Sequence, residues 1–351
     1  MKTVLTTRTS FSIVLCFVCI GLLSYATTVS VHGQRGLGLS DARTLQKAIS
    51  IAERDAPDKG VAAMRDAVEQ FKTNPTAWYY YGFALTRSGD LEGARNAFKQ
   101  ALKFDPDFIL ARLRLARTLL LANQPGEAEK EARRALGSDA KPADLHYVFG
   151  EVALFCGDAS RALDEARASF QTNSSFAPTF LLRHQATLLT LRESSYWKPE
   201  KREQLRQLLK DAIESLEKYL ALAQPKSNDG FLREQLETLR FYAKAAEGDP
   251  QRPDREFFFP NEVTTKAHVF SKPEPHYTDS ARSVHMQGGV VLCAVLSAGG
   301  SIEHLLVLQS LPFGLTGASI EAAKQTQFTA ATKDGQTVST WTQLEYNFNL
   351  Y

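Results

Sequence analysis

The stretch TAWYYYGFALTRSGDLEGARNAFKQALKFDP, from Thr76 to Pro106, decides how this chain folds. Its apolar residues recur at helical spacing, and the pattern predicts two helices, Thr76–Ser88 and Leu91–Phe104. Gly89 and Asp90 separate these helices, because both residues favour turns over helix interiors. The stretch therefore predicts one antiparallel helix pair with a two-residue turn.

Each predicted helix carries an apolar face that includes very small residues. Gly82 in the first helix and Ala94 in the second have almost no side chain, so the two helices can approach closely there. The apolar positions are Trp78, Tyr81, Gly82 and Leu85 in the first helix, and Ala94, Phe98 and Ala101 in the second.

The same positions recur along the chain every 34 residues. Four columns keep this period: Ala94, Ala128 and Ala162; Gly82, Ala116 and Gly150; Tyr81, Leu115 and Phe149; and Ala101, Ala135 and Ser169. A helix-turn-helix unit of this length resembles the tetratricopeptide repeat (TPR). The resemblance implies an all-α solenoid over 41–247, with three clear repeats, a weak first repeat in Asp41–Lys72, and capping helices after the third repeat.

In TPR proteins the first helices of the repeats line a concave groove, and the resemblance implies a peptide-binding groove here. The predicted groove residues are Tyr79, Phe83, Arg87, Leu113, Arg117, Tyr147 and Glu151. The aromatic members are assigned to the groove because Trp78 and Tyr81 already fill the core side of their helix. For the leucine, packing between repeats is the alternative.

The first 26 residues predict a signal peptide. Lys2 and Arg8 precede the apolar run Phe11–Leu23, and small residues follow at Ser24 and Ala26. The run is shorter than the roughly 20 residues that span a bilayer. The sequence therefore predicts export to the periplasm, with an uncleaved inner-membrane anchor facing the periplasm as the alternative.

Charge and cysteine content narrow the class of partner. The formal net charge of +2 falls to 0 when the two basic residues of the signal are removed. A neutral chain without a basic cluster argues against nucleic acid as a partner. Cys156 and Cys293 remain in different predicted domains, so two free, buried thiols are predicted rather than a disulfide.

A joint rich in proline is predicted at 248–272. Pro250, Pro253 and Pro260 exclude a continuous helix there. The run Phe257–Phe259 is too apolar to remain in solvent, so it is predicted to pack one domain against the other. The joint is therefore expected to be rigid.

Beyond the joint the apolar period changes from helical to two, which is the period of a strand. The order of elements predicts a small α+β domain at 273–351, with two short helices on a three-stranded antiparallel sheet. The predicted elements are a helix at Pro275–Val284, strands at Gly289–Leu296 and Ser301–Gln309, a helix at about Thr316–Gln327, and a final alternating strand from Val338 to Leu350.

This order resembles the C-terminal domain of TonB-type energy transducers. The resemblance is carried by Pro275, Tyr277, Ala281, Gly289-Val290-Val291, Val307 to Ser310, Ala322-Ala323, Phe328, Ala330-Ala331, Gly335 and the terminal aromatic strand. It implies that the last strand recruits an extended segment of an outer-membrane transporter by strand addition. The implied edge residues are Leu344, Tyr346, Phe348 and Leu350, with an entry segment at Pro275 and Tyr277. In the alternative, the repeats or a second copy of the chain, as a homodimer, cover this edge.

The residue patterns of catalytic and metal sites are absent from the sequence. The histidines of the second domain, at 268, 276, 285 and 304, lack the i, i+4 spacing of a helical metal site. No nucleophile elbow or phosphate loop occurs either. The sequence therefore predicts a non-enzymatic chain with no catalytic residues, no metal site and no cofactor.

Together the patterns predict a periplasmic interaction protein. Its small domain engages an outer-membrane transporter or another envelope protein, and its repeats recruit a second protein. If the N-terminus stays in the inner membrane, a motor complex there can use the chain as a transducer. The alternative is a structural scaffold for envelope assembly whose TonB-like domain pairs only with itself.

Overall fold

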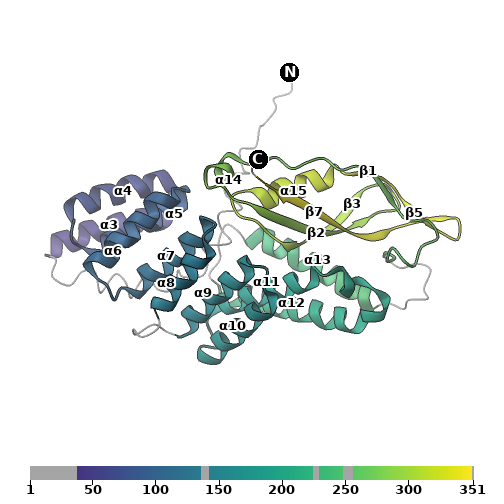
Figure 1. The fold of residues 1–351 in the computed structure, drawn as a ribbon, viewed down its shortest axis with the longest axis horizontal. Helices are drawn as coiled ribbons and strands as arrows, with labels where there is room; N and C mark the ends of the chain where they lie inside the picture. The colour runs from purple at the N-terminus through teal and green to yellow at the C-terminus, as the bar shows by residue number, and fades with distance from the viewer. Residues whose placement is uncertain (1–37, 136–141, 224–228, 248–255, 350–351) are drawn as a thin grey trace, which may run out of the picture. The chain divides into compact units, whose positions relative to one another are not determined.

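The protein is described by a computed structural model that covers residues 38–135, 142–223, 229–247 and 256–349. A series of helices precedes a small antiparallel sheet with helices, as the sequence predicts (Figure 1). The chain divides into two compact units, one ending at Pro178 and the other beginning at Thr179. The predicted signal peptide lies outside the described residues, as does the first part of the predicted joint. None of the described helices is long and apolar enough to cross a membrane.

The described part of the first unit consists of four antiparallel helix pairs. Each helix contacts its own partner and the helix that follows, and the first helices of successive pairs also contact one another. The segment predicted as a weak first repeat thus forms a helix pair, α3 with α4, that packs on the next pair. The helices are α3 (Leu39–Arg54), α4 (Pro57–Gln70), α5 (Pro75–Ser88), α6 (Leu91–Phe104), α7 (Ile109–Leu121), α8 (Pro125–Arg134), α9 (Pro142–Phe155) and α10 (Ala159–Thr172).

Local sequence explains where the central pair begins and ends. The Asn74 side chain accepts a hydrogen bond from the Ala77 amide at 3.1 Å and caps the start of α5. Gly89 ends α5 in the left-handed region at φ 89°, a conformation that glycine adopts without strain. Asp90 then caps α6 by accepting from the Gly93 amide at 2.8 Å. The predicted turn is thus two helix caps placed back to back.

Close approach within this pair depends on Gly82. A Cβ atom at this position would lie 2.8 Å from the ring of Phe98 in α6, which is closer than side chains pack. Phe98 is fully buried, and so are Ala94 and its 34-residue equivalents Ala128 and Ala162. The period read from the sequence is therefore the period of the buried contacts between paired helices.

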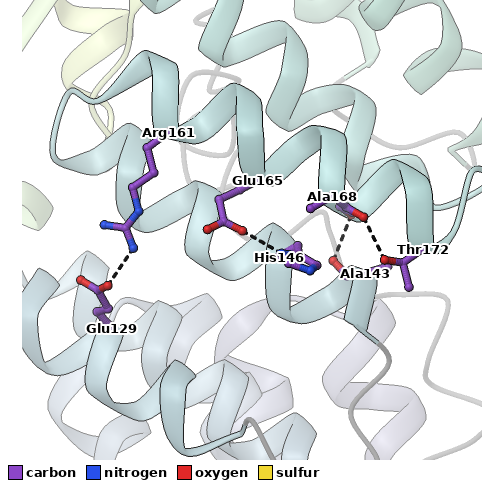
Figure 2. A network of polar contacts seen from close by, with 8 residues as sticks. Glu129, Ala143, His146, Arg161, Glu165, Ala168 and Thr172 are labelled. Carbon is purple, nitrogen blue, oxygen red and sulfur yellow. Dashed lines mark hydrogen bonds and ion pairs between the residues drawn. The ribbon is translucent and has the colours of Figure 1, made fainter.

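One polar contact joins the second helices of the last two pairs, and another joins the two helices of the last pair (Figure 2). The Arg161 guanidinium on α10 donates to Glu129 on α8 at 2.7 Å, and the pKa of Glu129 is lowered by this contact. His146 on α9 contacts Glu165 on α10 at 2.8 Å. These contacts are partly exposed, so they add to repeat packing without forming its core.

The second unit starts with helices and ends with the sheet. Its helical part comprises α11 (Ala177–Leu191), the short 3-10 helices η2 (Ser194–Trp197) and η3 (Pro199–Lys201), α12 (Arg202–Leu222) and α13 (Asp229–Glu247). The remaining elements are β1 (His268–Ser271), α14 (Asp279–Ser283), β2 (Gly288–Leu296), β3 (Ile302–Gln309), α15 (Leu315–Lys324), β4 (Gln327–Thr329), β5 (Ala331–Lys333), β6 (Gln336–Val338) and β7 (Thr340–Phe348).

The main sheet has three antiparallel strands, as predicted, and their order is β3-β2-β7. β2 pairs with β7 along its whole length, from Gly288 opposite Phe348 to Leu296 opposite Thr340. Two small ladders, β1 with β4 and β5 with β6, were not predicted. Their strands have three or four residues each, which is too short for a periodic signal.

Both faces of the main sheet are covered, which explains why β2 is buried from Val290 to Leu296 without alternation. α15 contacts β2 and β3. On the other face the indole of Trp341 stacks on Trp197, with ring centroids 5.0 Å apart and 18° between the planes. Tyr242 of α13 packs edge-on against the same Trp197. Helices of the first predicted domain therefore complete the core of the second.

The helix predicted at Pro275–Val284 is shorter than expected. α14 begins only at Asp279, because the Thr278 hydroxyl caps it by accepting from the Ala281 amide at 3.2 Å. Proline at 275 favours an extended chain before this cap. The entry segment is consequently extended rather than helical.

Candidate functional site

The outer edge of β7 is the candidate site, and its backbone geometry shows which groups face outward. At its start, the Trp341 amide donates to the Phe258 carbonyl at 3.0 Å, and the Phe258 amide donates to the Ser339 carbonyl at 2.9 Å. Trp341 thus points its backbone groups away from β2. Because strand residues alternate, Gln343, Glu345 and Asn347 point the same way.

Among the described residues, no backbone group pairs with the outer side of β7 from Gln343 to Asn347. One side chain reaches it: the Lys272 ammonium donates to the Glu345 carbonyl at 2.8 Å and lies 4.8 Å from the centre of the Tyr346 ring. Lys272 is exposed, and an exposed charged side chain can be displaced at little cost. This edge therefore presents about one short strand's length of unpaired backbone.

The side chains predicted at this edge point into the domain. Leu344, Tyr346 and Phe348 are each at most 4% exposed, and burial raises the pKa of Tyr346. Leu350 lies outside the described residues. Any segment added to β7 would therefore contact its backbone and the exposed side chains of Glu345 and Asn347, not the aromatic rings.

The entry segment lies beside the end of β7. The Tyr277 ring is 5.7 Å from Phe348, and its hydroxyl donates to the Met286 carbonyl. The Arg282 guanidinium lies 5.0 Å from the centre of the same ring. Pro275 is half-buried. The structure thus brings Tyr277 and Phe348 together, and the role of this segment in binding a partner stays a prediction.

The predicted groove residues of the repeats are packed between helices. Tyr79, Phe83 and Tyr147 are 3–6% exposed, whereas Trp78 and Tyr81, expected in the core, are half-exposed. Tyr79 packs against Phe98 and Phe108, and Tyr147 against Phe176. Leu113 is fully buried, which agrees with the alternative of packing between repeats. Their role as peptide contacts stays a prediction.

The charged groove residues also contact neighbouring helices. Arg87 donates to the Ala52 carbonyl and, at 2.9 Å, to the Asp55 carbonyl at the end of α3. The Arg117 Nε lies 2.7 Å from Glu151, whose other oxygen accepts from the Tyr147 hydroxyl at 3.0 Å. Burial raises the pKa of Glu151, and the Arg117 guanidinium opposes that shift. These groups hold α3 to α5 and α7 to α9.

Sequence reasoning missed three residues that contact the two edges of the main sheet. Phe258 occupies the start of β7, Lys272 lies across its middle, and Gln235 of α13 reaches the opposite edge of the sheet on β3. Their contacts join residues 70 or more positions apart. The apolar run at 257–259 was the one signal in the sequence that pointed to any of them.

No cluster of three or more histidine, cysteine or acidic side chains suited to a metal occurs among the described residues. Cys156 and Cys293 are both free, as predicted, but the prediction that Cys156 is buried is wrong, because it is exposed. Cys293 is fully buried, and burial raises the pKa of its thiol to about 12. A thiol with that pKa is a poor nucleophile at neutral pH.

Comparison with known proteins agrees with both resemblances. Residues 273–350 match the family of the Gram-negative bacterial TonB protein C-terminal, and residues 85–149 match the tetratricopeptide repeat. No curated protein matches the chain. Both families generally act as scaffolds rather than enzymes. The two domains point to a protein-interaction adaptor, and the TonB-type domain points to association with the cell envelope.

Several solved structures are similar to part of this chain. PilW, a widely conserved type IV pilus biogenesis factor, is 19% identical, with a TM-score of 0.45 over 60% of this chain and 90% of PilW. MamA from Desulfovibrio magneticus RS-1 is 16% identical, with a TM-score of 0.39 over 53% of this chain and 97% of MamA. YrrB, a TPR protein with an unusual peptide-binding site, is 19% identical, with a TM-score of 0.34 over 59% of this chain and 95% of YrrB. These likenesses carry no functional argument.

Proposed function

We propose that this chain, with its tetratricopeptide repeats and TonB-type C-terminal domain, is a periplasmic adaptor that adds a strand of an outer-membrane transporter to β7. The single observation that supports this is the outer backbone of Gln343, Glu345 and Asn347, which no backbone group of the described residues pairs with. Backbone pairing supplies affinity for an extended segment whatever its sequence, and neighbouring side chains supply selectivity.

The footprint of the added segment follows from what already occupies the edge. Phe258 takes the Ser339 carbonyl and the Trp341 amide, so the segment begins to pair at the Trp341 carbonyl and the Gln343 amide. It ends where the chain leaves β7 after Phe348, beside Tyr277. The segment is therefore about five residues long, and it displaces Lys272 from the Glu345 carbonyl.

The repeats recruit the second protein in this proposal. The half-exposed rings of Trp78 and Tyr81 and the surface of the first helices are available for it, since Tyr79, Phe83 and Tyr147 are committed to packing. Export by the N-terminal segment delivers the chain to the periplasm. If the signal is cleaved, the chain acts only as a tether between its partners. If the signal is retained, an inner-membrane motor complex can act on the chain. The N-terminal sequence of the mature protein separates these two forms.

Glu345→Pro tests the proposed edge. Proline removes the outward Glu345 amide but leaves the ladder to β2 intact, because Glu345 does not bond to that strand. A photo-crosslinker at exposed Asn347 in the full chain, in envelopes of the native host, should capture an integral outer-membrane transporter. We expect E345P to reduce capture at least about tenfold, the effect of losing one essential hydrogen bond.

Glu345→Ala is the matched control, because it removes the side chain and keeps the amide. Strand addition at β7 is contradicted if E345P still captures the transporter. It is also contradicted if E345A loses capture as completely as E345P does. A crosslinked dimer of the chain in place of a transporter supports the scaffold alternative instead.

A further inference from the structure

The main sheet has a second edge on β3, and α13 lies against it (Figure 1). The Gln235 side chain is 5% exposed and faces this strand. Its Nε2 donates to the Leu305 carbonyl at 3.2 Å, and its Oε1 accepts from the Val307 amide at 2.8 Å. One side-chain amide thus satisfies two outward backbone groups of β3.

The two bonds of Gln235 have the pattern of a parallel strand. A residue of such a strand donates to one neighbour and accepts from the residue two positions further on. Phe258 makes this pair of bonds to Ser339 and Trp341 on β7 with its backbone. Gln235 forms the same pair of hydrogen bonds, to Leu305 and Val307, with its side-chain amide. The side-chain amide therefore stands in for one peptide unit of an added strand.

Further contacts hold α13 at the β3 edge. The Tyr242 hydroxyl donates to the His304 carbonyl at 2.8 Å, and the Phe241 ring stacks on the His304 ring with centroids 3.4 Å apart. His304 lies in the left-handed region at φ 51°, where the register between β2 and β3 shifts. Arg192 donates to the Gln309 side chain at the end of the strand. These contacts lie on either side of Gln235, so the outward backbone groups of Leu305 and Val307 between them are covered by the Gln235 side chain.

We infer that Gln235 of α13 blocks the β3 edge against strand addition and so prevents the chain from pairing with a second copy of itself through β3. An unprotected edge strand is a template for pairing, and natural sheets cover or interrupt such edges. The side chains of Leu306, Val307 and Leu308 are buried in the domain, so the β3 edge presents its backbone at the place that Gln235 contacts. After loss of the block, the occupant is the same edge of another copy, because two such edges offer each other amide and carbonyl groups in an antiparallel pair.

This inference concerns the edge that the proposed function does not use, and its test needs no transporter. The first measurement is hydrogen exchange of the Val307 amide in the full chain. Gln235→Met keeps the length of the side chain and removes both bonds, so Val307 should exchange about tenfold faster, as expected for loss of one buried hydrogen bond. Gln204→Met, the same change at an exposed position of α12, should leave this rate unchanged.

The second measurement is sedimentation of the same variants over a range of concentrations. The unsubstituted chain and Q204M should not pair through β3, whereas Q235M should form an additional dimer. This additional dimer should persist in Q235M combined with E345P, because it uses β3 and not β7. Failure of the transporter test with E345P would leave this result unaffected, so the two proposals fail separately.

Either of two dimerisation results would overturn the inference: Q235M gains no dimer although Val307 exchanges faster, or its dimer disappears when E345P blocks β7. Gln235→Glu guards against a variant that fails to fold, because a carboxylate still accepts from the Val307 amide and loses only the bond to Leu305. Q235E should keep Val307 protected and dimerise less than Q235M; equal exchange at Val307 in the two variants would also contradict the inferred bond.

Discussion

At the scale of single residues, the absence of a side chain at Gly82 sets the distance between α5 and α6. Gly82→Ala should lower the stability of the repeats by about 1–3 kcal/mol, because its Cβ would overlap the buried Phe98 ring. Gly126→Ala is the control: it lies in α8 with open space around it, and alanine favours a helix by up to about 1 kcal/mol. Denaturant midpoints of the two variants should therefore move in opposite directions.

His184 gives the second unit a dependence on pH. It is buried on α11, its Nδ1 lies 3.0 Å from the Ala212 carbonyl, and burial lowers its pKa from 6.5 to about 4. The unfolded chain binds a proton between these values and the folded chain does not, so stability is complete above about pH 6.5 and falls as the pH drops toward 4. The loss is on the order of 3 kcal/mol.

The measurement is the free energy of unfolding at pH 7.5 and pH 4.5. His184→Asn retains an amide donor near the Ala212 carbonyl and does not titrate, so this variant should lose part of the pH dependence. An unchanged difference between the two pH values in H184N would show that another group is responsible.

The burial of a residue could be predicted where the residue follows the 34-residue period. It could be predicted less well where burial depends on which face of a helix packs against the next repeat. Gly82, Ala94 and Phe98 are buried as the spacing predicts. Tyr79 and Trp78 are adjacent, and the spacing alone does not reveal which contacts the next repeat. The first helix of a repeat touches its own partner and two neighbouring first helices, so little of its circumference is left for solvent.

At the scale of elements, a buried ion pair connects α7 to α9. The side chains of Arg117 and Glu151 are 4% and 13% exposed. Arg117→Met should destabilise the repeats by about 3–5 kcal/mol, because it leaves the Glu151 carboxylate buried without its partner. The double variant Arg117→Met with Glu151→Met should recover most of that loss.

A double-mutant cycle from denaturant unfolding measures this coupling. If both residues contacted a peptide in an open groove, each single variant would reduce binding with little change in stability. Additive, small stability effects would thus contradict the structural role of the pair and favour the predicted groove.

Long periodic elements were predictable, whereas short ones and contacts between elements were not. β2 and β3 end at the predicted residues and each begins one residue away from the prediction, because glycine or polar turns bound their apolar runs. β4, β5 and β6 have three residues each; β4 is held by pairing with the distant β1, and β5 and β6 pair with each other across a tight turn. The Gln235 contact with β3 has no sequence signal, since glutamine is common on helix surfaces.

At the scale of the whole molecule, the sheet domain depends on helices that precede it. The family match begins at 273, but the compact unit begins at Thr179. A fragment of residues 273–351 lacks Trp197, Gln235 and Phe258, so it should expose Trp341 and the β3 edge. We expect it to be less stable than fragment 179–351 by at least about 3 kcal/mol, comparable to truncating a buried tryptophan.

Denaturant unfolding and sedimentation of both fragments test this expectation. Fragment 179–351 should unfold in one transition and remain free of association through β3. If the two fragments were equally stable and fragment 273–351 were monomeric, α13 and η2 would contribute no stability to the sheet and would not cover its edge.

The stacked indoles of Trp197 and Trp341 provide the second unit with a spectroscopic label of its own. The two indole rings have centroids 5.0 Å apart and planes 18° from parallel. At this separation their transitions couple as an exciton, and a twist between the transition dipoles splits the circular dichroism band into a pair of opposite sign. Trp78, the remaining tryptophan of the chain, lies in the other unit and contributes no such couplet. The docking of η2 on the sheet can accordingly be followed optically, without a dye, during folding or while a guest binds.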